Sequence, residues 1–117
     1  MLYLGAQVRY FLFSQVVDMR KGCYGLSGLV RHEMQQDVLS GDVFVFLNKR
    51  CNKIKLLQWD RDGFVLYEKH LEKGTFERPA KSSEDDGILL SHLQLQHILQ
   101  GVVLQSVRQR KRYARMA

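Results

Sequence analysis

Hydrophobic positions in the middle third of the chain fall into short runs that predict strands. Residues 42–47, DVFVFL, are apolar almost throughout, which is typical of a central strand covered on both faces. Residues 53–59, KIKLLQW, alternate in part between charged and apolar side chains. The turn at 60–63 ends in an Asp-Gly pair, which tolerates positive φ, and leads to a return strand over residues 63–69. Three strands joined by short turns predict an antiparallel meander.

Helical patterns are expected on both sides of this meander along the sequence. A short apolar strand at residues 8–13 precedes Asp18, which we place as the N-cap of a first helix. Apolar residues then recur at steps of three and four until Ser40-Gly41 breaks the pattern: Leu26, Leu29, Val30, Met34 and Val38. A second helix is expected from about Ile88 to Gly101, behind an acidic stretch that favours a helix N-terminus.

The predicted fold class is therefore α+β. A small antiparallel β-meander of three to four strands packs with one helix from the N-terminal half and one C-terminal helix. A chain of 117 residues, 45% hydrophobic and 26% charged, is expected to form one globular domain. We assign residues 1–107 to this single domain and residues 108–117 to a basic tail.

Positive charge is concentrated in that tail. The whole chain has a formal charge of +6, yet residues 1–107 are nearly neutral. The last ten residues contain no acid and five cations: Arg108, Arg110, Lys111, Arg112 and Arg115. A cationic tail binds polyanions because each phosphate that it neutralises releases condensed counterions. The tail is therefore either part of a nucleic-acid interface or a solubilising end.

Several classes of protein are not expected. The longest strongly apolar run, residues 43–47, is far shorter than the roughly 20 residues of a membrane helix. The first residues lack the basic segment of a signal peptide. Cys23 and Cys51 are too few for a disulfide framework. We expect a cytoplasmic protein without a membrane partner, a metal or a cofactor.

Three carboxylates are the candidates for catalysis. Asp18, Asp60 and Asp62 could together hold a divalent cation, as nuclease carboxylates do. Asp-x-Asp-Gly is also ordinary hairpin chemistry, in which carboxylates bond nearby backbone amides. The chain lacks zinc-ligand spacing and a phosphate-binding glycine loop. The turn is therefore the favoured interpretation, and a metal-dependent nuclease is the lesser one.

A basic cluster is better defined than any catalytic group. Lys49, Arg50, Lys53 and Lys55 lie on one turn and its following strand, and Trp59 belongs to the same strand. Nucleic-acid-binding surfaces place cations on phosphates and aromatic rings on bases. The alternative is a solvated sheet edge over a core that contains the aromatic residues.

Further candidates lie near the start of the first predicted helix. Arg20 and Lys21 oppose the helix dipole there, which favours a nearby anion. That anion is either a phosphate or an internal carboxylate such as Asp60. Three glycines spaced three apart allow close backbone approach, and we favour close packing over ligand contact: Gly22, Gly25 and Gly28.

Three blocks of motifs follow one another in a set order. They are Asp18-Met19-Arg20-Lys21-Gly22 with Tyr24-Gly25-Leu26; Gly41 with residues 43–46, 48–50 and 53–57; and Trp59-Asp60 with Asp62-Gly63-Phe64, then Leu71-Glu72-Lys73-Gly74. Over residues 8–101 this order resembles the TnpB-type accessory proteins of insertion sequence family 66, the products of its second open reading frame. The motif surface of the family corresponds to Asp18, Met19, Gly22, Asp60, Asp62 and Gly63.

The sequence departs from the pattern of that family at three places. Arg61 stands where a glycine is common, and Cys51-Asn52 replaces a glycine-containing turn. Arg78 stands where an aromatic residue often precedes Pro79. The first change adds a charge to the Asp-Gly turn and could alter a contact made there.

The resemblance implies a bacterial mobile-element protein that assists transposition, a form of DNA recombination, beside a separate and larger transposase. We therefore expect a non-catalytic protein that binds DNA phosphates with weak sequence selectivity and assembles with that transposase. The expected DNA contacts are Arg20, Lys21, Lys49, Arg50, Lys53, Lys55, the supporting or stacking ring of Trp59 and the basic tail. The alternative is a protein–protein adaptor that docks through residues 18–22 and 59–63 without contacting DNA. The oligomeric state is left open.

Overall fold

Five strands and two helices make up the described part of the chain, residues 8–79 and 87–100 of a computed structural model. In chain order they are β1 (Tyr10–Phe13), α1 (Cys23–His32), β2 (Val43–Leu47), β3 (Lys53–Asp60), β4 (Gly63–His70), β5 (Gly87–Leu90) and α2 (His92–Gln100). The strands form one sheet in the order β4-β3-β2-β1-β5. β1 and β2 are parallel and joined through α1, whereas the other neighbours are antiparallel.

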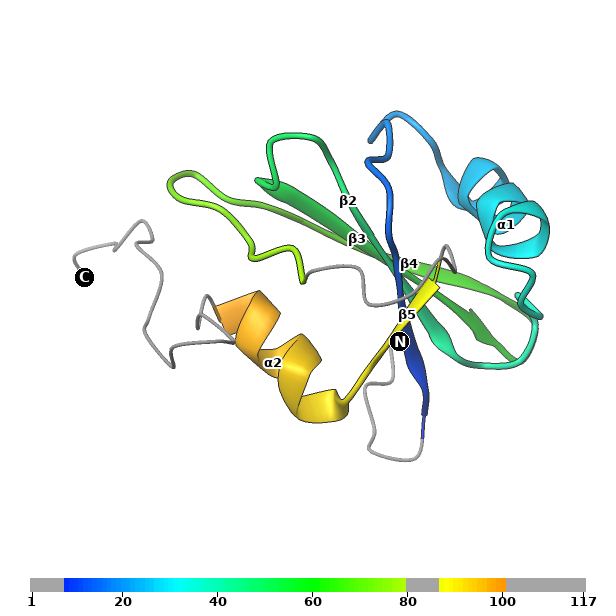
Figure 1. Cartoon of the computed structure of the whole chain (residues 1–117). Helices are drawn as coiled ribbons and strands as arrows, with labels where there is room; N and C mark the ends of the chain where they lie inside the picture. Colours follow the sequence, from blue (N-terminus) through cyan, green and yellow to red (C-terminus); the bar gives the residue numbers. More distant parts are fainter. Residues whose placement is uncertain (1–7, 80–86, 101–117) are drawn as a thin grey trace.

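The two helices lie on opposite faces of this sheet (Figure 1). Because successive strand residues point to opposite faces, β1, β2 and β3 each supply both cores, whereas β4 contributes to the α1-side core and β5 to the α2-side core. On the α1 face, Leu26 and Val30 pack with Phe44 and Phe46 of β2. On the α2 face, Leu95 and Ile98 join a core that includes these strand residues: Tyr10, Leu12, Val43, Val45, Leu47, Ile54 and Leu56. Every residue of β2 is fully buried, which confirms the predicted central strand.

The predicted α+β class is confirmed, and β2, β3 and β4 form the predicted antiparallel meander. The sheet has five strands, where three to four were expected, and it is mixed because β1 runs parallel to β2. Neither α1 nor α2 has the length and apolarity that a membrane crossing requires, within the ranges the structure describes.

The first helix is shorter than its apolar periodicity predicts. It begins at Cys23, with Gly22 rather than Asp18 at the N-cap, and ends at His32. Gln35 then adopts φ 54°, which ends helical geometry. The residues at the later helical positions, Met34 and Val38, still pack in the α1-side core from irregular backbone. Periodicity therefore located the buried side chains correctly and the helix boundary wrongly.

The second helix begins four residues later than predicted. Gly87–Leu90 forms β5, which pairs antiparallel with β1. A capping box then starts α2: the Gln94 backbone N–H donates to Ser91 Oγ at 3.0 Å, and the Ser91 N–H donates to Gln94 Oε1 at 2.8 Å. The sequence Ser-x-x-Gln at 91–94 marks this start, whereas the acidic stretch upstream suggested an earlier one.

The prediction of close packing at the α1 glycines is wrong for two of them among the described residues. A Cβ added at Gly22 or Gly28 would meet nothing within 4 Å. A Cβ at Gly25 would approach only the side chain of Lys21, at 3.2 Å. These glycines therefore do not mark a contact between α1 and another described element.

Two departures from the family pattern fall at backbone positions that favour glycine. Cys51 has φ 54° and Arg61 has φ 56°. The β3–β4 turn thus has its positive φ at Arg61, and not at Gly63 as the Asp-Gly pair suggested. A residue with a Cβ is strained in the left-handed region, and the family's glycines at these places would avoid that strain.

We predict that Arg61→Gly stabilises the protein relative to Arg61→Ala by about 1 kcal/mol, because glycine relieves the positive φ while both variants remove the same charge. Chemical denaturation of the two variants measures the difference in unfolding free energy. Equal midpoints and slopes would contradict this account of the turn.

Candidate nucleic-acid interface

A surface hollow of about 450 Å³ lies where β3 begins, between the loop after β1 and the β2–β3 turn. Both segments lie at the same end of the sheet (Figure 1). The charged groups lining the hollow are four cations and two carboxylates: Arg20, Lys49, Arg50, Lys53, Asp18 and Glu68. These six residues come from three segments of the chain, residues 18–20, residues 49–53 and Glu68 of β4, so the fold assembles the site.

The β2–β3 turn is shaped by the side chain of Asn48. Asn48 Oδ1 accepts the backbone N–H groups of Asn52 at 3.1 Å and Lys53 at 3.0 Å. Its Nδ2 donates to Asn52 Oδ1 at 2.7 Å. These bonds close the turn and leave Lys49 and Arg50 exposed at its tip. Within the described ranges, neither of these two cations takes part in an ion pair.

Arg78 holds the same turn through main-chain carbonyls. Its Nη2 donates to the oxygens of Leu47 and Asn48, each at 3.2 Å, and its Nη1 donates to the Gln15 oxygen at 3.4 Å. The guanidinium therefore connects the end of β2 to the loop that follows β1. Arg78 departs from the family pattern, and nothing in its local sequence indicates these distant acceptors.

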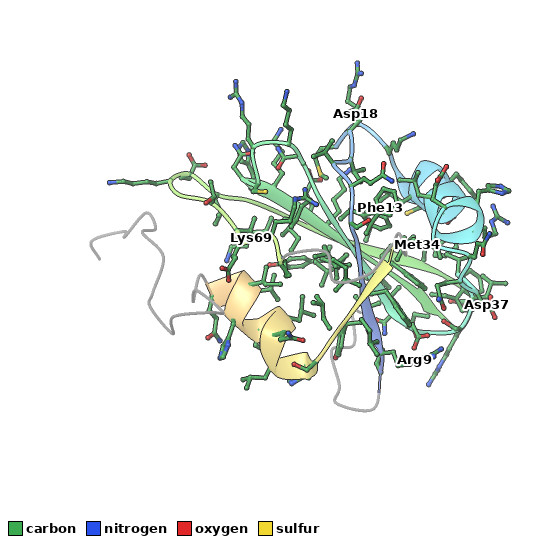
Figure 2. The ribbon with its side chains drawn as sticks, viewed as in Figure 1. Arg9, Phe13, Asp18, Met34, Asp37 and Lys69 are labelled. Carbon is green, nitrogen blue, oxygen red and sulfur yellow. The ribbon has the colours of Figure 1, made fainter. Side chains whose placement is uncertain are left out.

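On the other side of the hollow, Asp18 and Arg20 form a compact turn. The Asp18 carboxylate accepts the Arg20 backbone N–H at 2.9 Å, Nη2 at 2.7 Å and Nε at 3.0–3.1 Å. The Arg20 side chain is 91% exposed. Figure 2 shows Asp18 at the tip of its loop, far from Arg9 and Asp37 at the other end of the molecule. The anion beside Arg20 is thus Asp18, and not Asp60.

These bonds from Arg20, the side-chain bond first, lower the pKa of Asp18 from 3.8 to about 2. The same pairing raises the pKa of Arg20. Asp18 therefore stays ionised throughout the physiological range and keeps Arg20 in place.

Lys55 lies beneath this turn and is only 5% exposed. Its ammonium donates to the carbonyl oxygens of Met19 at 2.7 Å and Lys21 at 2.8 Å. Glu68 Oε2 lies 3.9 Å from the same Nζ. The prediction that Lys55 contacts phosphate does not fit this position, because the ammonium points into the protein and serves the loop.

The remaining candidates are divided between two ends of the sheet. Trp59 and Asp60 line a second hollow, of about 360 Å³, with Asp42 and Gln58. They lie at the far end of β3 from Lys53, about 20 Å away for Trp59 and about 23 Å for Asp60 at 3.3 Å per residue. The ring of Trp59 packs edge-on against Phe64, with centroids 5.1 Å apart. The prediction that Trp59 contacts DNA beside the basic residues of the β2–β3 turn therefore does not fit the structure.

The nuclease hypothesis requires Asp18, Asp60 and Asp62 to lie close together, and the structure places them at different ends of the sheet. Asp18 lines the basic hollow, whereas Asp60 and Asp62 lie at the β3–β4 turn. In the part of the chain that the structure describes, no three His, Cys, Asp or Glu side chains are grouped as metal ligands would be. The three carboxylates therefore do not form the metal site that was considered.

Other predicted residues have structural roles or lie outside the described chain. Lys21 is exposed beside the hollow, Met19 packs against the α1-side core and Gly22 caps α1. Gly63 begins β4. The predicted contacts of the basic tail, Arg108, Arg110, Lys111, Arg112 and Arg115, lie outside the described residues.

The family assignment follows from comparison with known proteins. The model of the family described as IS66 Orf2 like protein matches residues 8–109. The chain belongs to the IS66 Orf2-like family. An uncharacterised protein of Sinorhizobium fredii (strain NBRC 101917 / NGR234), y4jC, is 40% identical over 72 residues, an alignment that covers 62% of each chain. A second one, y4hO, is 32% identical over 102 residues, or 87% of each chain. No solved structure matches.

Membership of the IS66 Orf2-like family supports an accessory role in insertion-sequence transposition. In this IS66 Orf2-like protein the family motifs form two separate surfaces. The Asp-Met-Arg-Lys-Gly segment meets the Asn-Lys-Arg turn at the basic hollow. The Trp-Asp-x-Asp-Gly segment lies at the opposite end of β3.

Sequence reasoning missed Glu68 in the basic hollow, although the hairpin contains the signal. A turn that pairs Asp60 with Gly63 places Lys55 opposite Glu68 five residues further along each strand. In this IS66 Orf2-like protein, the register of the β3–β4 hairpin alone therefore pairs Lys55 with Glu68.

We predict that the Asp18 carboxyl titrates with a midpoint near pH 2 in the folded protein, and with a midpoint raised towards its ordinary 3.8 in Arg20→Gln, which loses the side-chain bonds of Arg20 but keeps the backbone N–H donor of residue 20. Because the folded pKa is lowered, the pairing stabilises the turn fully above about pH 4 and is lost as the pH falls through 2. NMR titration of the Asp18 side-chain carboxyl measures both midpoints. A wild-type midpoint of 3.8 would contradict the observed bonding.

Proposed function

We propose that this protein is a non-catalytic accessory subunit of insertion-sequence transposition that binds DNA through the basic hollow and assembles with the separate transposase. One observation carries the proposal. Arg20, Lys49, Arg50 and Lys53 come from two distant segments and line a single exposed hollow. Membership of the IS66 Orf2-like family supports the transposition context, and we place the protein in the bacterial cytoplasm at the nucleoid.

The chemistry of the hollow suits the sugar–phosphate backbone of DNA. Cations that neutralise phosphates release counterions, so they contribute affinity at low salt without reading sequence. Asp18 occupies Nε and Nη2 of Arg20 and leaves Nη1 directed away from that contact, available for a phosphate oxygen. The predicted contacts of the basic tail would add further counterion release.

The two carboxylates in the hollow limit the attraction but do not cancel it. Asp18 is half-exposed and engaged with Arg20, and Glu68 lies beside the Lys55 ammonium. Lys49, Arg50 and Lys53 have no such counter-charge among the described residues. The net field of the hollow is therefore positive, which steers a polyanion towards it.

We predict that Arg50→Gln weakens binding to a labelled DNA duplex and lowers the slope of log affinity against log salt by about 0.9, because one phosphate contact is lost. Arg61→Gln removes the same charge at the far end of β3 and should leave the slope unchanged. Fluorescence anisotropy across a salt series measures both, on an element-end duplex and on a scrambled one. Wild-type affinity that is independent of salt, or equal slopes for the two variants, would refute this interface.

A second candidate function is the protein–protein adaptor, and one observation favours it. Tyr24 on α1 is 87% exposed and lines an apolar hollow of about 230 Å³ together with Leu39, which is 54% exposed, and Phe64. Exposed aromatic residues beside an apolar hollow are common anchors of protein interfaces. The occupant under this hypothesis is the transposase of the same element.

We predict for the adaptor that Tyr24→Ala weakens capture of the purified transposase by about tenfold, the effect of losing an interfacial aromatic anchor. Tyr67→Ala, on β4 and on the other face of the sheet, is the matched control and should capture it normally. Equal capture by both variants would exclude this hollow as the transposase contact.

A further inference from the structure

We propose that Lys55 is a positioning residue for Arg20: it fixes the loop that presents Arg20 to DNA and makes no DNA contact itself. The inference rests on the proposed DNA-binding function of the basic hollow. It distinguishes Lys55 from Lys53, which lies two residues earlier on the same face of β3 and lines the hollow directly.

Lys55 holds the main chain on both sides of Arg20. Its ammonium donates to the carbonyl of Met19 and to that of Lys21, the residues immediately before and after Arg20. The Arg20 peptide is thus held from below at two points. The Lys55 side chain is 7% exposed, so its charge is enclosed by the loop that it binds.

Asp18 holds Arg20 from the opposite side of the loop. Its carboxylate accepts both the backbone N–H and the guanidinium of Arg20. The backbone and the side chain of Arg20 are therefore fixed before any ligand arrives. An arginine ordered in advance loses less conformational entropy on binding than a freely rotating one.

The buried charge of Lys55 also explains why the loop of residues 18–21 is held against β3. A buried ammonium must be satisfied by hydrogen bonds or by a counter-charge, because burial without them is unfavourable. The carbonyls of Met19 and Lys21 accept its hydrogen bonds, and the Glu68 carboxylate supplies the counter-charge. Loss of the ammonium would leave the Met19 and Lys21 carbonyls without their donor, so the loop would no longer be held to β3.

A double-mutant cycle between Lys55 and Arg20 tests the proposal. Lys55→Met keeps most of the side-chain volume and removes the donor, and we expect it to weaken duplex binding about threefold to tenfold in the otherwise wild-type protein. In an Arg20→Gln background the same change should cost less than about twofold, because the residue through which Lys55 acts is gone. Fluorescence anisotropy at one low salt concentration gives all four affinities.

Lys53→Met is the matched control in the same cycle. It removes an equal charge from the same strand, and it should weaken binding by the same factor with or without Arg20. If Lys55→Met also costs the same factor in both backgrounds, or costs nothing, the positioning role is overturned. If Arg20→Gln alone leaves binding unchanged, the proposed DNA function of this hollow fails, and the inference fails with it.

A spectroscopic measurement separates positioning from general destabilisation. In Lys55→Met the NMR signal of Arg20 Nε–H should shift, and the Asp18 midpoint should rise from about 2 towards 3.8, while Lys53→Met changes neither. Unchanged Arg20 and Asp18 signals in folded Lys55→Met would overturn the proposal. Circular dichroism verifies folding, and Lys55→Gln, which keeps two N–H donors without the charge, replaces Lys55→Met in the cycle if that variant is unfolded.

Discussion

Burial of both faces of the sheet is the constraint on which the rest of the structure depends. β2 lies at its centre with no exposed side chain, and α1 and α2 cover opposite faces. Positions along β2 and the middle of β3 must therefore be apolar or have their polar groups satisfied. Lys55 is the one cation that enters this buried region among the described residues. The loop of residues 18–21 covers it and supplies its hydrogen-bond acceptors, so a requirement of the core fixes the shape of a surface loop.

The cations at this end of the sheet consequently divide into two groups. Lys55 and Arg78 turn inward and bond main-chain carbonyls of the two segments that border the hollow. The four cations that line the hollow turn outward from those segments. This division explains how a nearly neutral domain can have a rigid basic surface. The inward cations contribute rigidity, and the outward ones contribute the field that attracts an anion.

Sequence patterns predicted the features that depend on local burial. The consecutive apolar residues of β2 and the Asp-rich turn gave the strands of the meander, and three-and-four spacing identified Met34 and Val38 as core. The boundaries of α1 and α2 were missed because a positive φ at Gln35 and the bonds of Ser91 decide them. Lys55 was grouped with Lys53 because the two lysines alternate with Ile54 and Leu56 and so share one face of the predicted strand. The fold places the loop of residues 18–21 over Lys55 but not over Lys53, so Lys55 is buried and Lys53 lines the hollow.

The same constraint bears on what the hollow can recognise. Its cations project from main chain that is fixed by internal bonds, and Trp59 lies too far along β3 to stack on a base beside them. Contacts of this kind read charge and the spacing of phosphates. Sequence selectivity in transposition would then have to come from another surface or another subunit. The separate hollow around Tyr24 has the apolar character expected of a protein contact, so the proposed DNA contact and the alternative protein contact lie at different sites of one small domain.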